Sequence, residues 1–201
     1  MTIKDKLEQK LNKSPVHTAI VKRDQTFEVY SSKIDPNQYN KQEILQFIKS
    51  ECSKTNGQTN TKLSCWQSSY HIHKETSLFD KLVTLVNSTV NDFFDLDYEY
   101  RLLVQESWAA VYKKGDYARL HGHGSFCNFS AVLYLQSNKE HSPLSFEDGF
   151  SLPCFEDTIY FFNSNYRHLV SPSQSDNLRI ILGFNFICLD PYILKVYNEN
   201  N

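Results

Sequence analysis

Apolar residues recur every three or four positions in parts of the first half of the chain, a spacing typical of helices that bury one face. One such segment covers residues 35–50 and begins with Asp35-Pro36, an acidic N-cap followed by proline. Another covers residues 76–95 and begins at the Thr76 cap. A short helix is also predicted over residues 2–12.

Short apolar runs separated by turn residues dominate the second half of the chain and predict strands. These runs cover residues 98–112, 116–123, 128–135, 144–146, 158–162, 168–170 and 178–189. Two earlier strands, 17–21 and 26–30, are predicted around a polar turn at residues 22–25. So many short strands with regular turns are typical of a sandwich or a barrel.

We therefore predict a mainly β fold with flanking helices, in which a double-sheet, cupin-like jelly roll covers about residues 97–190. The helices of the N-terminal half are expected to cover its outer face. Residues 53–62 form a polar, turn-rich loop inside that half. We expect residues 1–75 to be an N-terminal α/β elaboration that packs on the core, and residues 76–201 to be the β domain with its leading helix.

The last predicted strand separates apolar side chains from polar ones, because successive side chains point to opposite faces. One face is uniformly apolar, as expected beneath helices, and consists of Ile180, Leu182, Phe184 and Phe186. The other face consists of Arg179, Ile181, Gly183 and Asn185. A charge, a glycine and an amide are unusual in a core, so this face is expected to line a ligand cavity.

The composition indicates a protein with a large core and little net charge. Apolar residues make up 40% of the chain and aromatic residues 14%, which argues against intrinsic disorder. The formal net charge of -2 gives no reason to expect a nucleic-acid or acidic membrane partner. The chain has no long apolar run and begins with a polar amphipathic segment rather than a signal peptide. We therefore expect a soluble cytoplasmic protein.

The cysteines argue against two kinds of site. There are 5 of them, an odd number, widely scattered and without a C-x-x-C pair. This pattern fits neither a disulfide framework nor a structural zinc site. We expect free, buried thiols.

Three histidines and an arginine form the most informative chemical pattern. On a strand, residues two apart share a face, so His121 and His123 can reach one point together. His168 would arrive there from a distant strand, and three imidazoles suit a divalent metal such as Fe(II), Zn(II) or Cu(II). Arg179 follows as a candidate clamp, because a guanidinium group can bind a carboxylate through two parallel hydrogen bonds.

A second pair, His71 and His73, has the same spacing but a different context. It lies in a stretch rich in serine and lysine before a helix cap, with no third ligand at a regular interval. We interpret these residues as surface or packing histidines. The first pair is flanked instead by Gly122 and Gly124, which allow backbone and ligand to approach closely.

Ordered runs of residues surround the three histidines. Residues 108–117 (WAAVYKKGDY) precede His121-x-His123, and residues 130–135 (SAVLYL) follow it. Residues 157–164 (DTIYFFNS) precede His168, and residues 179–185 (RIILGFN) begin with the arginine. In this order the set resembles a family of small 2-oxoglutarate/Fe(II)-dependent oxygenases with a His-x-His…His…Arg pattern, over roughly residues 104–190.

The resemblance implies a double-stranded β-helix, a jelly-roll variant, with Fe(II) as metal, 2-oxoglutarate as cosubstrate and O2 as oxidant. The implied metal ligands are His121, His123 and His168. Arg179 is implied to bind the far carboxylate of 2-oxoglutarate, with Asn185 and Tyr134 as weaker cosubstrate-binding candidates and Asn128 and Tyr112 behind them. The implied activity is that of a dioxygenase that hydroxylates a protein or peptide residue or a small metabolite.

His123 marks a departure from the wider superfamily, most of whose members carry an acidic ligand at that position. The site is therefore one charge more positive than a site with an acidic ligand at that position. An alternative frame takes His123 as the first ligand and puts Ser125 at the acidic position, leaving an open site like that of iron halogenases. Two other functions fit the same residues: a cupin-like three-histidine metal enzyme that does not use 2-oxoglutarate, and a non-catalytic ligand-binding barrel.

Overall fold

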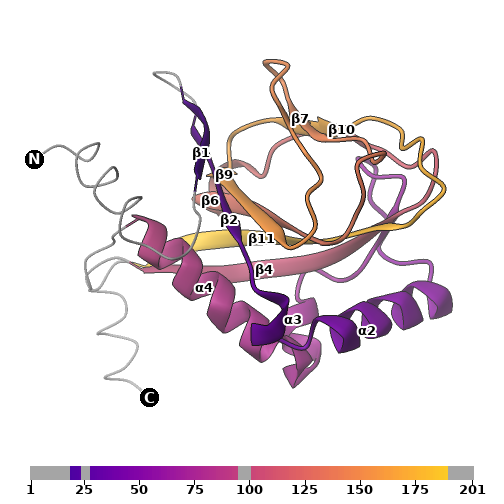
Figure 1. Ribbon diagram of the computed structural model, residues 1–201, viewed down its shortest axis with the longest axis horizontal. Helices are drawn as coiled ribbons and strands as arrows, with labels where there is room; N and C mark the ends of the chain where they lie inside the picture. Colours follow the sequence, from indigo (N-terminus) through magenta and orange to yellow (C-terminus); the bar gives the residue numbers. More distant parts are fainter. Residues whose placement is uncertain (1–18, 24–27, 95–100, 190–201) are drawn as a thin grey trace, which may run out of the picture.

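The computed structural model describes residues 19–23, 28–94 and 101–189. These residues form two antiparallel sheets, and helices pack beneath the larger one (Figure 1). The predicted β fold with flanking helices is therefore confirmed. The helix predicted over residues 2–12 lies outside the described residues.

Two longer helices, α2 (Lys41–Lys54) and α4 (Asp80–Phe94), lie along the lower face of the larger sheet (Figure 1). The shorter helical turns are η1 (Pro36–Gln38), α3 (Ile72–Glu75) and η2 (Ser77–Phe79). Thr76 caps η2, which leads directly into α4, so the second predicted helix is confirmed. Among the described residues, no helix has the length and apolar character needed to cross a membrane.

The first predicted helix begins later than Asp35-Pro36 indicates. The Asp35 carboxylate accepts a hydrogen bond from the Asn37 N–H at 2.9 Å, but the turn that it caps is the short η1. Tyr39 then adopts an extended backbone, with φ -144° and ψ 167°, which interrupts the helical path. The helix proper starts at Lys41, and the predicted apolar stripe is buried on it.

The larger sheet has the strand order β1-β2-β9-β6-β11-β4-β3 within the described residues. Its strands are β1 (Ala19–Arg23), β2 (Glu28–Lys33), β3 (Trp66–Gln67), β4 (Arg101–Tyr112), β6 (Phe129–Gln136), β9 (Thr158–Asn163) and β11 (Arg179–Leu189). The smaller sheet has the order β5-β10-β7-β8. Its strands are β5 (Ala118–His121), β7 (Leu144–Phe146), β8 (Ser151–Leu152) and β10 (His168–Val170). Each predicted strand is present within a few residues, whereas β3 and β8 are too short to produce an alternating pattern.

Strands from the first 75 residues extend both edges of the larger sheet. The β1–β2 hairpin joins through β2 to β9, and β3 pairs with β4. These strands therefore continue the sheet that carries the core. The division of the chain at residue 75 stays a prediction.

Apolar side chains pack on both faces of the larger sheet. The lower layer lies against α2 and α4 and includes Ile180, Leu182, Phe184 and Phe186. The upper layer lies between the two sheets and includes Val132, Phe162 and Val170. The alternation predicted for β11 is confirmed, because Arg179, Ile181 and Gly183 line a cavity on the upper side.

Candidate metal centre

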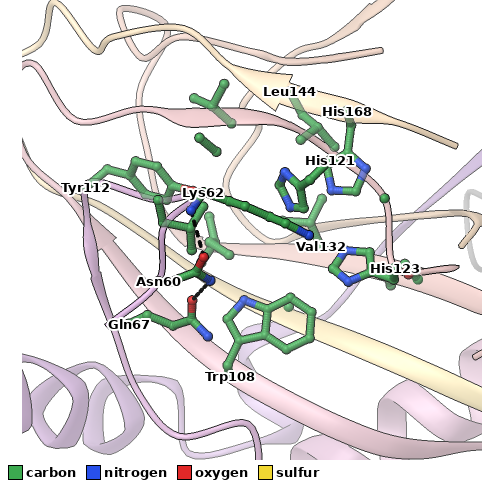
Figure 2. A pocket seen from close by; sticks show the side chains of 18 of the residues that line it. Asn60, Lys62, Gln67, Trp108, Tyr112, His121, His123, Val132, Leu144 and His168 are labelled. Atoms are coloured by element: carbon green, nitrogen blue, oxygen red, sulfur yellow. Dashed lines mark hydrogen bonds between the residues drawn. The ribbon is translucent and has the colours of Figure 1, made fainter. Parts of the chain in front are cut away.

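Three histidine side chains converge on one point of that cavity (Figure 2). His121 is the last residue of β5, and His168 faces it across the antiparallel pairing of β5 with β10. One nitrogen from each of His121, His123 and His168 lies within 4.8 Å of the other two. The His121 and His168 ring centroids are 4.5 Å apart, and those of His123 and His168 are 5.3 Å apart. This arrangement allows all three imidazoles to bind a single metal ion.

His123 does not lie on the strand that carries His121, which corrects the strand-spacing argument. The strand β5 ends at His121, and His123 adopts φ -97° and ψ -7° at the start of the short η3 (Gly124–Phe126). Its backbone N–H donates to the Ser164 carbonyl oxygen at 3.0 Å. The two histidines therefore converge because the chain turns after the strand, and that turn is fixed against the residues that follow β9.

Backbone carbonyls orient two of the three imidazole rings. The Nδ1 atom of His121 lies 2.7 Å from the Arg119 carbonyl oxygen, and that of His168 lies 2.9 Å from the Tyr166 carbonyl oxygen. Because a carbonyl oxygen only accepts hydrogen bonds, each Nδ1 carries the proton. The lone pair then resides on Nε2, which is left to bind a metal.

Burial keeps the three imidazoles neutral near pH 7. Burial lowers the pKa of His121, and it lowers the pKa of His123 to about 4 and the pKa of His168 to about 3. Neighbouring positive groups lower these pKa values further. A histidine must be deprotonated to bind a metal, so the site needs little proton release on loading at pH 7.

The lowered pKa values predict that the metal-free protein loses stability as the pH falls below about 6.5. Unfolded histidines take up protons near pH 6.5, whereas folded His123 and His168 take them up only near pH 4 and 3. Unfolding therefore binds protons in this window, and the free energy of unfolding falls with pH, by at most about 1.4 kcal/mol per pH unit for the buried His168. Urea unfolding in EDTA between pH 7.5 and 4 should show a shallower decline for a His123→Gln/His168→Gln variant. Equal slopes would contradict this assignment.

The cavity that holds the histidines has a volume of about 370 Å³ and lies between the sheets. This size is typical of small-molecule sites. Arg179, Tyr112, Tyr134 and Trp108 line it together with the histidines. In the described part of the chain, no aspartate or glutamate is among the lining residues.

Arg179 is buried in the cavity wall without an anionic partner. It is 2% exposed, and its Nη1 atom donates to the Ser142 carbonyl oxygen at 2.6 Å. The guanidinium carbon lies 3.9 Å from the centroid of the Tyr112 ring, and Nε has no hydrogen-bond partner among the residues that the structure describes. Within the described residues, no carboxylate forms an ion pair with this side chain.

Three ionisable groups near Arg179, those of Tyr112, Tyr134 and Cys65, are neutral at pH 7. Burial raises the pKa of the Tyr112 and Tyr134 hydroxyls well above the usual range, and it raises the pKa of the Cys65 thiol to about 12. The guanidinium charge is therefore not neutralised by these groups. A buried, uncompensated charge is costly, so this end of the cavity suits a carboxylate ligand.

Of the weaker predicted candidates, Tyr134 and Tyr112 line the cavity, whereas the two asparagines do not. The Asn185 Oδ1 atom accepts from the Ser130 hydroxyl at 2.9 Å, and its Nδ2 atom donates to a Glu106 carboxylate oxygen at 2.7 Å. Asn185 therefore reaches the cavity only through Ser130, which lines it. Asn128 is exposed and accepts from the Cys188 backbone N–H.

Trp108 is a cavity residue that the sequence interpretation missed. Its ring centroid lies 5.5 Å from that of His123 (Figure 2). The Tyr70 ring centroid lies 5.5 Å from that of Trp108 as well. A usable signal was present, because Trp108 lies an even number of residues from Tyr112 on the same strand and so shares its face. Gly183 faces Trp108 across the pairing of β11 with β4, and the absence of a side chain there leaves room for the indole.

Replacing Gly183 by alanine is expected to displace Trp108 and destabilise the fold by about 1–3 kcal/mol, as overpacking of a core does. A Cβ atom at this position would lie 2.4 Å from the indole ring. Denaturant unfolding and tryptophan fluorescence measure both effects. Gly122→Ala is the control, because its Cβ would meet no atom closer than 3.5 Å. Wild-type fluorescence and stability for Gly183→Ala would contradict the packing argument.

Outside the centre, the predicted free cysteines are confirmed, whereas their predicted burial holds for three of the five, because Cys52 is partly buried and Cys188 is exposed. His71 is exposed, and the His73 Nδ1 atom is hydrogen-bonded to the Ser107 hydroxyl at 2.8 Å. All five cysteines are free, and Cys65, Cys127 and Cys154 are buried. None of these residues belongs to a cluster of three potential metal ligands in the described part of the chain.

Known structures share this architecture. No family model and no curated protein matches the chain. A Pseudomonas putida prolyl-4-hydroxylase superposes with a TM-score of 0.60 and 15% identity, covering 92% of this chain and 98% of the other. The viral collagen prolyl hydroxylase vCPH of Paramecium Bursaria Chlorella virus-1, in complex with 2OG, superposes with a TM-score of 0.57 and 17% identity. This match covers 78% of this chain and 94% of the other. HygX from Streptomyces hygroscopicus, with nickel and 2-oxoglutarate bound, superposes with a TM-score of 0.55 and 13% identity, covering 80% of this chain and 82% of the other.

At such low sequence identities, the TM-scores of these matches establish similarity of fold alone. They confirm the double-stranded β-helix that the sequence resemblance implied, and a three-histidine group is present in its cavity. The chain therefore has the double-stranded β-helix fold of the 2-oxoglutarate/Fe(II) oxygenases.

Proposed function

We propose that the protein is a 2-oxoglutarate- and Fe(II)-dependent dioxygenase that hydroxylates a protein or peptide residue or a small metabolite. One observation carries the proposal: a buried guanidinium group without a carboxylate partner lines the same cavity as three convergent, neutral imidazoles. A dicarboxylate with a keto group can bind the metal at one end and the guanidinium group at the other.

In this proposal His121, His123 and His168 hold Fe(II), and Arg179 binds the far carboxylate of 2-oxoglutarate. Three neutral nitrogen ligands suit Fe(II) and leave coordination positions for a cosubstrate. When bound, Fe(II) and 2-oxoglutarate supply the oxidation by O2, with succinate and CO2 as the coproducts.

The residues of the cavity wall are assigned positioning roles. Tyr134 is 1% exposed and keeps its proton, so its hydroxyl can donate to an oxygen of the cosubstrate. Asn185 would act through Ser130, whose hydroxyl it orients. Apolar side chains such as Val132 and Ile181 complete the wall, and they exclude water from the reaction.

Formation of succinate from 2-oxoglutarate tests this proposal. The Fe(II)-loaded protein is incubated with 2-oxoglutarate in air, and succinate is quantified against an anaerobic sample and a metal-free sample. We expect slow succinate formation that requires both metal and O2. A cupin-like enzyme that does not use 2-oxoglutarate, or a non-catalytic barrel, would form no succinate above the controls.

A further inference from the structure

A lysine from the N-terminal part of the chain enters the cavity beside the histidines. Lys62 is an exposed residue at the edge of the cavity, which it lines, and its side chain extends toward the three imidazoles (Figure 2). The backbone holds it in place, because its N–H donates to the Asn60 Oδ1 atom at 2.9 Å and its carbonyl oxygen accepts from the Arg119 N–H at 2.8 Å. The loop that carries Lys62 is therefore fixed to β5, the strand that ends at His121.

The Lys62 ammonium group has no acidic partner within the described residues. The cavity supplies none either, because no aspartate or glutamate is among its described lining residues. A cation held beside a metal site is repelled by the metal unless an anion lies between them.

A hydrogen-bond donor without a partner among the described residues also lines the cavity. Gln67 is 1% exposed and lines the cavity. Its Oε1 atom accepts from the Asn60 Nδ2 atom at 3.0 Å, while its Nε2 atom is buried without a hydrogen-bond partner. A buried amide nitrogen in this state is costly unless a ligand accepts from it.

The charges of the loaded site do not balance with the cosubstrate alone. A divalent metal and Arg179 contribute three positive charges inside the cavity, the exposed Lys62 adds a fourth at its edge, and the described lining residues contribute no negative charge. The 2-oxoglutarate dianion supplies two negative charges, which leaves an excess of two positive charges beside the metal. A substrate that carries its own anionic group would lower this excess.

We propose that the substrate is a small carboxylate whose anionic group binds Lys62 beside the metal, while Gln67 offers a separate hydrogen-bond donor in the same cavity. This inference rests on the proposed function and specifies its substrate class. The cavity volume of about 370 Å³ fits a small organic acid. Lys62 thereby determines specificity, while Arg179 is reserved for the cosubstrate.

Ligand-observed NMR on the Co(II)-loaded protein tests the proposal, because paramagnetic broadening reports binding close to the metal. The probes are acetate and butyrate with their primary amides, each titrated with and without saturating 2-oxoglutarate. We expect wild type to bind the carboxylates at least 10-fold more tightly than the amides. Lys62→Met should lose this preference, Lys62→Arg should keep it, and both should bind 2-oxoglutarate within about twofold of wild type.

Lys49→Met serves as the charge-matched control, since Lys49 is exposed on α2, away from the cavity. It should keep the wild-type preference for carboxylates. The proposal is overturned if wild type shows no preference, if Lys62→Met retains it, or if Lys62→Met instead weakens 2-oxoglutarate binding 10-fold, which would assign the lysine to the cosubstrate. A wild-type protein that prefers carboxylates near the metal but binds no 2-oxoglutarate would refute the proposed function and support the carboxylate site.

Discussion

Replacing His168 by alanine is expected to weaken Fe(II) binding at least about 100-fold and to abolish succinate formation. His168 supplies one of the three nitrogens that lie within 4.8 Å of one another, and β10 fixes it opposite His121. Loss of a residue that only supports a metal ligand costs about 10–100-fold in affinity, so loss of a ligand should cost more. Competition with a chromophoric chelator under anaerobic conditions measures the Fe(II) dissociation constant.

His71→Ala is the matched control for this substitution. His71 belongs to a histidine pair with the same spacing as His121 and His123, but it is exposed and outside the cavity. The His71→Ala protein should bind Fe(II) like wild type, and circular dichroism should show that both variants are folded. Fe(II) binding by His168→Ala within threefold of wild type would exclude His168 as a ligand.

Replacing Arg179 by methionine is expected to weaken 2-oxoglutarate binding at least about 30-fold and to leave Fe(II) binding unchanged. Loss of a buried charge partner costs about 2 kcal/mol or more, which corresponds to this factor. The stability of the protein without ligand should stay the same or rise, because methionine removes a buried charge that has no carboxylate partner. The increase in melting temperature on addition of 2-oxoglutarate should be lost.

Thermal unfolding with and without 2-oxoglutarate, together with calorimetric titration, measures these effects. Arg179→Lys should lie between wild type and Arg179→Met, because lysine keeps the charge but lacks the planar fork that matches a carboxylate. Wild-type 2-oxoglutarate affinity in the methionine variant would show that Arg179 does not bind the cosubstrate. A large fall in the stability of that variant without ligand would show that the guanidinium group is mainly structural.

Much of the fold followed from local periodicity. The strands β7 and β10 were predicted to the residue, and β11 showed its two faces because apolar and polar positions alternate along it. The sequence pattern did not predict the structure correctly where contacts outside the segment decide its conformation. Asp35-Pro36 is a good start signal, yet it began the short η1, since Tyr39 returns the chain to an extended conformation before α2. Two-residue strands such as β3 carry no periodicity at all.

The histidines and Arg179 were predictable because their chemistry is unusual in its place: a charge on a core strand and imidazoles beside glycines. The reason given for the pairing of His121 with His123 was wrong in detail, since a turn brings them together. Lys62 and Gln67 could not be predicted, because the packing of Lys62 against β5 and of Gln67 against β4 depends on contacts distant in sequence. Trp108 could have been found from the strand period.

The central claim is that one cavity binds Fe(II) through three histidines and 2-oxoglutarate through the metal and Arg179. Anaerobic titration of the Fe(II)-loaded protein with 2-oxoglutarate, followed by visible absorption, tests this most directly. We expect a charge-transfer band that saturates at one equivalent of 2-oxoglutarate, is absent from His168→Ala and needs far more 2-oxoglutarate in Arg179→Met. Stoichiometric Fe(II) binding without any such band at high 2-oxoglutarate concentration would contradict the claim.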